Sequence, residues 1–140
     1  MIRRAWLRAG LVIAAALAPL STGAHAASGI GDIAGTWINP HGSVKVVTGD
    51  CGGRLCGWIS WVNAEAMADA QASGVTRLIG TELLRNYRAT DAGRWQGEVY
   101  VPDMGRTFYS TIDLRGHDRL RISGCILGGF ICKSQIWQRA

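Results

Sequence analysis

The chain has 140 residues, of which 48% are hydrophobic and 18% are charged, and its formal net charge is +5. This length can form one compact domain but not two separate hydrophobic cores. The charge does not indicate a nucleic-acid-binding protein, because the basic residues are spread along the chain and only Arg115, Arg119 and Arg121 lie close together.

The first 26 residues have the order of a secretory signal peptide. Three arginines precede an apolar run over residues 9–20, and Ala24-His25-Ala26 forms a small-x-small cleavage motif. We therefore predict that residues 27–140 form a single mature domain, which is periplasmic or secreted. The apolar run is too short to remain as a membrane anchor, so we predict no integral membrane segment after cleavage. Removal of the leader also removes three of the fifteen basic residues and leaves a nearly neutral domain.

Eight β-rich segments follow, separated by turns that contain glycine, asparagine and aspartate. Their regular spacing is typical of an antiparallel barrel or sandwich, and each connection is short enough to join neighbouring strands. Alternation is clearest near residue 110, where Phe108, Ser110 and Ile112 share one face. The predicted strands cover residues 33–39, 43–48, 55–62, 81–89, 94–101, 106–114, 119–124 and 130–139.

Residues 64–73 interrupt the β pattern. This segment is rich in alanine and contains Met67, so it favours a helix over a strand. We predict one short helix or lid between the third and fourth strands, and no other helix in the mature domain.

All four cysteines lie in the mature domain, as two local pairs that each enclose a Gly-Gly step. An even number of cysteines in a small exported domain indicates disulfide bonds. Because Gly-Gly favours tight turns, we predict that Cys51 pairs with Cys56 and that Cys125 pairs with Cys132. The second pair would flank a two-residue turn at Gly128-Gly129, as a wide, hydrogen-bonded strand pair.

A second pairing remains open, in which Cys51 joins Cys125 or Cys132. This arrangement would close a longer loop and so restrict the unfolded chain more strongly. The cysteine spacing lacks the C-x-x-C steps of a zinc site or a redox-active pair, so we predict no metal.

The two ends of the domain resemble the closing plug of lipocalin-like proteins. Gly35-Thr36-Trp37 opens the first predicted strand, and Trp137-Gln138-Arg139 closes the last. In such a plug the indole of Trp37 would seal one barrel end, and the Arg139 guanidinium would cover it while donating to strand-end carbonyls. The resemblance implies an all-β, eight-stranded, antiparallel up-and-down barrel in which Gly35, Trp37, Trp137 and Arg139 close one end.

The mature domain also resembles a bacterial exported family catalogued as domain of unknown function 2147. Residues 64–74 depart from the aspartate- and asparagine-rich stretch usual in that family, and the resemblance implies no activity. The matching motifs are Gly35-Thr36-Trp37, Cys51-Gly52-Gly53, Leu55-Cys56-Gly57 and residues 80–84, 95–100, 102–109 and 134–139.

Candidate catalytic residues are few. The histidines of the mature domain, His41 and His117, lie in predicted turns beside glycine, where polar residues are expected for backbone reasons. Asp103 could pair with Arg106 or Tyr109 at a barrel mouth, but aspartate is also a favoured turn residue. The nucleophile elbow, the P-loop and the H-E-x-x-H motif are absent from the sequence. We therefore predict a protein that is not an enzyme and that uses no cofactor.

Tryptophan is the stronger functional signal. Trp58 and Trp61 are three residues apart on a predicted strand and should point to opposite faces, so at least one should lie outside the core. An exposed ring could stack on a ligand or contact a protein, whereas the alternative is that both rings fill the barrel. Trp58, Trp61 and Tyr109 are the predicted ligand-binding residues.

From these observations we predict that the protein binds a ligand and does not catalyse a reaction. The ligand would be small and apolar or amphipathic, and would lie at the end of the barrel opposite Trp37 and Arg139, near residues 64–74. The alternative is a protein-binding module, such as an inhibitor of an envelope or secreted hydrolase. Strand number does not decide between them, because an eight-stranded barrel can be filled by its own side chains or hold one small ligand.

Overall fold

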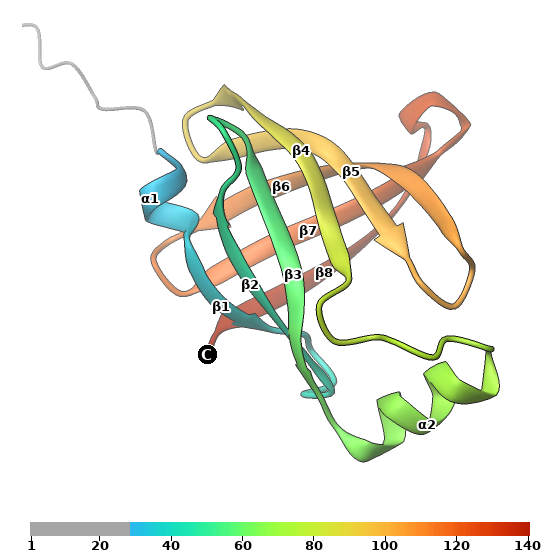
Figure 1. The fold of residues 1–140 in the computed structure, drawn as a ribbon. Helices are drawn as coiled ribbons and strands as arrows, with labels where there is room; N and C mark the ends of the chain where they lie inside the picture. The colour runs from blue at the N-terminus through green and yellow to red at the C-terminus, as the bar shows by residue number, and fades with distance from the viewer. Residues whose placement is uncertain (1–28) are drawn as a thin grey trace, which may run out of the picture.

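A computed structural model describes residues 29–140 of the protein (Figure 1). The predicted signal peptide, with cleavage before Ala27, lies outside these described residues. The described chain forms eight antiparallel strands, each paired with its neighbours in the sequence, and the first strand pairs with the last to close a barrel. The predicted eight-stranded, up-and-down antiparallel barrel is therefore confirmed.

The strands begin and end within two residues of their predicted positions. Their boundaries depend on pairing between strands as well as on side-chain type, which explains the small differences. The strands are β1 (Gly35–Ile38), β2 (Val44–Asp50), β3 (Leu55–Val62), β4 (Glu82–Asp91), β5 (Arg94–Val101), β6 (Arg106–Arg115), β7 (Arg119–Ile126) and β8 (Ile131–Arg139).

The helix predicted between the third and fourth strands is confirmed as α2 (Ala64–Ala72). It begins after Asn63, whose side chain accepts a hydrogen bond from the backbone N–H of Ala66 at 2.8 Å. It is not the only helix of the described chain, contrary to the prediction. A four-residue helix, α1 (Ile30–Ile33), precedes β1, and a short 3-10 helix, η1 (Leu127–Gly129), joins β7 to β8. Both are too short to produce a periodic pattern in the sequence.

The up-and-down order places the connections alternately at two ends of the barrel (Figure 1). We call the end with α1 and the β2–β3, β4–β5 and β6–β7 turns the closed end. The other end, with α2 and the β1–β2, β5–β6 and β7–β8 connections, is the open end.

Large aromatic side chains fill the closed half. Trp37, Tyr87 and Trp95 are each at most 1% exposed. The ring of Tyr87 lies directly against β5, because position 97 is a glycine and a Cβ atom there would be 2.6 Å from that ring. The closed half is thus packed by the protein's own side chains.

Two hydroxyl groups are buried inside the barrel without a hydrogen-bond partner among the described residues, those of Tyr87 and Ser110. Burial raises the pKa of Tyr87 above its ordinary value. The nearby Ser110 hydroxyl offsets part of this shift, and the charge of Glu98 adds to it. Burial in the barrel thus disfavours the ionised form of the Tyr87 side chain.

Arg139 covers Trp37 at the closed end. Its guanidinium carbon lies 4.2 Å from the centre of the Trp37 ring. The same group donates to the carbonyls of His117, Ala34 and Asp32 at 2.7, 3.0 and 2.9 Å. Beside it, Gly35 has a φ of 141°, and a Cβ atom there would be 2.6 Å from Nη1 of Arg139. One side chain therefore joins α1, the β6–β7 turn and the last strand.

Both disulfides form within a hairpin, between Cys51 and Cys56 and between Cys125 and Cys132. The turn predicted at Gly128-Gly129 is wrong in length, because β7 and β8 stay paired as far as Ile126 and Ile131 and leave a four-residue loop. Cys125 and Cys132 lie directly opposite, with Cα atoms 4.1 Å apart. This distance is that of a narrow strand pair, not of the predicted wide one.

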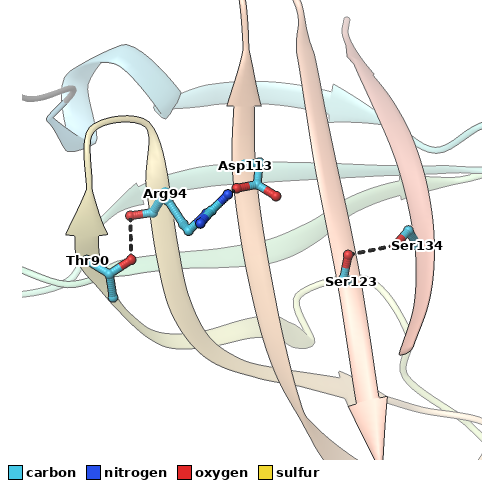
Figure 2. A network of polar contacts seen from close by, with 5 residues as sticks. All are labelled: Thr90, Arg94, Asp113, Ser123 and Ser134. Atoms are coloured by element: carbon cyan, nitrogen blue, oxygen red, sulfur yellow. Dashed lines mark hydrogen bonds and ion pairs between the residues drawn. The ribbon is translucent and has the colours of Figure 1, made fainter. Parts of the chain in front are cut away.

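The outer face carries polar contacts between neighbouring strands (Figure 2). Arg94 on β5 donates a hydrogen bond from Nε to the carboxylate of Asp113 on β6 at 2.6 Å, and this bond raises the pKa of Arg94. Ser123 on β7 and Ser134 on β8 share a hydrogen bond of 2.7 Å. Polar pairs between neighbouring strands help to set strand register, and a partly exposed ion pair such as Arg94–Asp113 contributes little stability.

Candidate ligand-binding site

A cavity of about 300 Å³ lies at the open end of the barrel, beside α2. Ile59, Leu83 and Trp137 form its apolar wall on the barrel side. Ala66 and Ala70 line it from α2, where their small side chains leave room between the helix and the barrel. We call this space the outer compartment.

A second space of about 230 Å³, the inner compartment, lies between β5 and β8. It shares Leu83, Pro102 and Trp137 with the outer compartment, so the two compartments adjoin, and we call them together the open-end cavity. Gly124 helps to create this space, because a Cβ atom there would have only an ordinary contact with Val99, at 3.5 Å. The open half is thus hollow where the closed half is filled by aromatic rings.

Charged and polar groups lie among the apolar walls. Lys133 is the one charged residue among the described residues that line the inner compartment. Next to it on the same face of β8, Gln135 accepts a hydrogen bond from Nε1 of Trp137 at 3.0 Å. The outer compartment has two carboxylates, Asp69 of α2 and Asp103 of the β5–β6 turn. Apolar walls with a few polar groups at defined positions suit an amphipathic molecule.

The predicted ligand-binding residues lie elsewhere. Trp58, Trp61 and Tyr109 are 36%, 41% and 43% exposed on the outer face, and none of them lines either compartment. Trp58 and Trp61 do not point to opposite faces, because a β-bulge leaves Ser60 without a partner between the pairs Val46–Ile59 and Lys45–Trp61. The extra residue returns Trp61 to the outer face, where the Lys45 ammonium lies 5.2 Å from its ring centre.

The structure assigns Trp137 a different place from the predicted one. It is 6% exposed and lines both compartments, whereas Gly35, Trp37 and Arg139 meet at the closed end. Sequence reasoning also missed Lys133 and Gln135. Alternation along β8 could have found them, because residues 133, 135 and 137 share the face that carries Trp137.

The two histidines of the described residues lie in exposed turns, His41 between β1 and β2 and His117 between β6 and β7. Within residues 29–140, no three His, Cys, Asp or Glu side chains are grouped so that they could hold a metal ion. Over the same range, no helix is long and apolar enough to cross a membrane.

A closed, up-and-down barrel of eight antiparallel strands, with one end plugged and the other hollow, is a lipocalin-like barrel. Its fold is similar to a solved structure described as "Protein HP1028 from the human pathogen Helicobacter pylori belongs to the lipocalin family". The two chains are 13% identical, and the match has a TM-score of 0.57 over 76% of this chain and 82% of the other. At this identity the likeness concerns the fold alone.

The chain belongs to the family described as "Uncharacterized protein conserved in bacteria (DUF2147)", whose model matches residues 35–139. The family resemblance predicted from the sequence is thereby confirmed. Among curated proteins, none has a significantly similar sequence.

Proposed function

We propose that this protein is an exported binding protein that holds a small apolar or amphipathic ligand in the open-end cavity. The observation that carries the proposal is the contrast between the two barrel ends. Aromatic rings and Arg139 close one end, whereas the other opens into a largely apolar cavity of about 300 Å³ with a neighbouring compartment of about 230 Å³. These volumes suit one small ligand.

Export is part of the proposal and rests on two observations. The sequence begins with the arginine, apolar and small-x-small order of a signal peptide, and all four cysteines form disulfides. Disulfides persist in oxidising compartments such as the periplasm. The proposed activity is binding without catalysis and without a cofactor.

In the alternative function, a protein-binding module such as a hydrolase inhibitor, the tryptophans of the outer face would contact the partner protein. Trp58 and Trp61 are only partly exposed, and Lys45 packs over one of them. The hollow open end has no role in that function, so the cavity favours the ligand-binding proposal.

Fluorescence titration tests the proposed site, with a fatty acid and its uncharged alcohol as probes. Trp137 lines the cavity and Trp58 lies outside it, so the signal change on binding should disappear in Trp137→Phe and persist in Trp58→Phe. Gly124→Leu should abolish binding of both probes, because its side chain would occupy the inner compartment. Gly49→Leu is the matched control, since a Cβ atom at this strand glycine meets nothing within 4 Å.

Two results would contradict the proposal. One is a titration in which neither probe changes the fluorescence of the unsubstituted protein, together with native mass spectrometry showing no ligand retained after gentle purification. The other is equal binding by Gly124→Leu and the unsubstituted protein.

A further inference from the structure

The β7–β8 hairpin ends in four exposed apolar side chains, which we call the apolar tip: Ile126, Leu127, Phe130 and Ile131. Phe130 is 91% exposed and Leu127 is 69% exposed, more than any other large hydrophobic side chain of residues 29–140. Side chains this exposed bury too little surface to stabilise the barrel. Their apolar character therefore indicates contact with something outside this chain.

The apolar tip continues the inner wall of the barrel. The pairs Ile122–Gln135, Gly124–Lys133 and Ile126–Ile131 alternate along the hairpin and so share one face. The first two pairs line the inner compartment, whereas the third lies beyond it at the tip. In Figure 1 the hairpin projects on the side of the barrel opposite to α1. The strand face that lines the cavity thus continues past Lys133 to the apolar tip.

The backbone of the tip holds a bulky residue in an unfavourable conformation. Leu127 has a φ of 53°, and Gly128 and Gly129 follow it with φ values of 67° and 96°. This left-handed region suits glycine or asparagine, whereas leucine is rare there. A leucine that is both strained and exposed does not serve the fold, which is consistent with a role in binding.

Charge distinguishes this hairpin from the rest of the chain. From Arg119 to the C-terminus there are four basic residues and no Asp or Glu. Lys133 follows the apolar tip by two residues. On the neighbouring β5–β6 turn, Met104 is 55% exposed, and the opposite charges of Asp103 and Arg106 flank it. Arg119 and Arg139 lie at the closed end, whereas Lys133 lies close behind the apolar tip, and the hairpin carries no acidic residue. An uncompensated lysine beside exposed apolar side chains favours an anionic lipid surface.

The size of the apolar tip argues against a second copy of the chain or another protein as its partner. Four large apolar side chains offer on the order of 400 Å², about half of what one side of a standard protein interface buries. A bilayer needs no matching surface and accepts a small projecting group. We propose that the apolar tip inserts into the surface of a membrane containing anionic phospholipid, which would bring the cavity next to the lipid.

Vesicle co-sedimentation tests this proposal. The protein should sediment with vesicles of phosphatidylcholine mixed with phosphatidylglycerol, less with phosphatidylcholine alone, and less as salt is added. Phe130→Ser should lower the partition coefficient roughly tenfold. Leu127→Asn should also lower it while the melting temperature stays equal or rises, because asparagine tolerates the left-handed conformation. Ile136→Ser is the control, since Ile136 is exposed on the same hairpin but lies away from the tip.

The proposal does not depend on ligand binding, so Gly124→Leu should still sediment with mixed vesicles even if its cavity is filled. It is overturned if the unsubstituted protein does not bind mixed vesicles, or if Phe130→Ser and Leu127→Asn bind as well as Ile136→Ser. A dimer in size-exclusion chromatography that Phe130→Ser dissociates would also overturn it, by identifying a second copy as the partner.

Discussion

The two halves of this barrel are built from the same strands but are packed in opposite ways. In the closed half, Trp37 and Tyr87 are buried and Arg139 ties three segments together. In the open half, Gly124 and the alanines of α2 leave a cavity, and Lys133 lies among apolar walls. The difference shows that the position of a residue along a strand decides whether it packs in the core or lines the cavity.

The largest expected effect comes from the closed end. Trp37→Ala should lower the free energy of unfolding by about 3–5 kcal/mol, because it leaves a cavity under Arg139 and removes the ring that this guanidinium covers. Trp61→Ala, on the outer face, should cost under about 1 kcal/mol. Denaturant titration of both variants measures the difference. A comparable loss in both would remove the distinction between a packed closed end and the outer wall.

Substitution of one glycine in each half compares how tightly the two halves are packed. Gly97→Ala should destabilise the protein by about 1–3 kcal/mol, because a Cβ atom there would be 2.6 Å from the Tyr87 ring and 2.7 Å from the carbonyl oxygen of Arg85. Gly124→Ala should change stability by less than about 0.5 kcal/mol, since its new atom enters the cavity region with an ordinary contact to Val99. Thermal melting can rank the two variants. If Gly124→Ala is the more damaging one, the open half is not hollow.

Tyr87→Phe is expected to have only a small effect at neutral pH. Its hydroxyl is buried without a partner, so removing it should change the free energy of unfolding by less than about 1 kcal/mol, in the stabilising direction. At alkaline pH the variant should have a larger advantage. Burial raises the pKa of Tyr87 in the folded state, so tyrosine ionises first in the unfolded chain, and native stability falls as pH rises above about 10.

Stability measurements of Tyr87→Phe and of the unsubstituted protein between neutral and alkaline pH check this expectation. The two curves should separate above about pH 10, with Tyr87→Phe the more stable. Parallel curves would show that the Tyr87 hydroxyl is not buried in the folded protein.

Regular features of the sequence predicted most of the fold. Strand positions follow from alternation and turn residues, whereas the closing contact of Trp37 with Arg139 was implied by the resemblance of the two end motifs to lipocalin-like proteins. The helix α2 could be predicted because its alanines interrupt the β pattern of the sequence. The helix α1 and the four-residue loop between β7 and β8 were missed, because such short segments carry no periodicity.

The sequence predicted where a cavity lies but not which residues line it. Placing it at the end opposite Trp37, near α2, agrees with the cavity, but Trp58, Trp61 and Tyr109 lie on the outer face. One bulged residue, Ser60, reverses the direction of Trp61, and sequence alternation cannot reveal a bulge.

By itself, the sequence determined the number and order of the strands and the cysteine hairpins. These features depend on local turn chemistry and on side-chain alternation, which short stretches of chain contain. Only the tertiary structure decided that Trp137 and Lys133 line a cavity and that Phe130 is exposed at the apolar tip of the β7–β8 hairpin. Those positions depend on strand pairing across the closed barrel, where residues distant in sequence share one interior and a single bulge redirects a side chain.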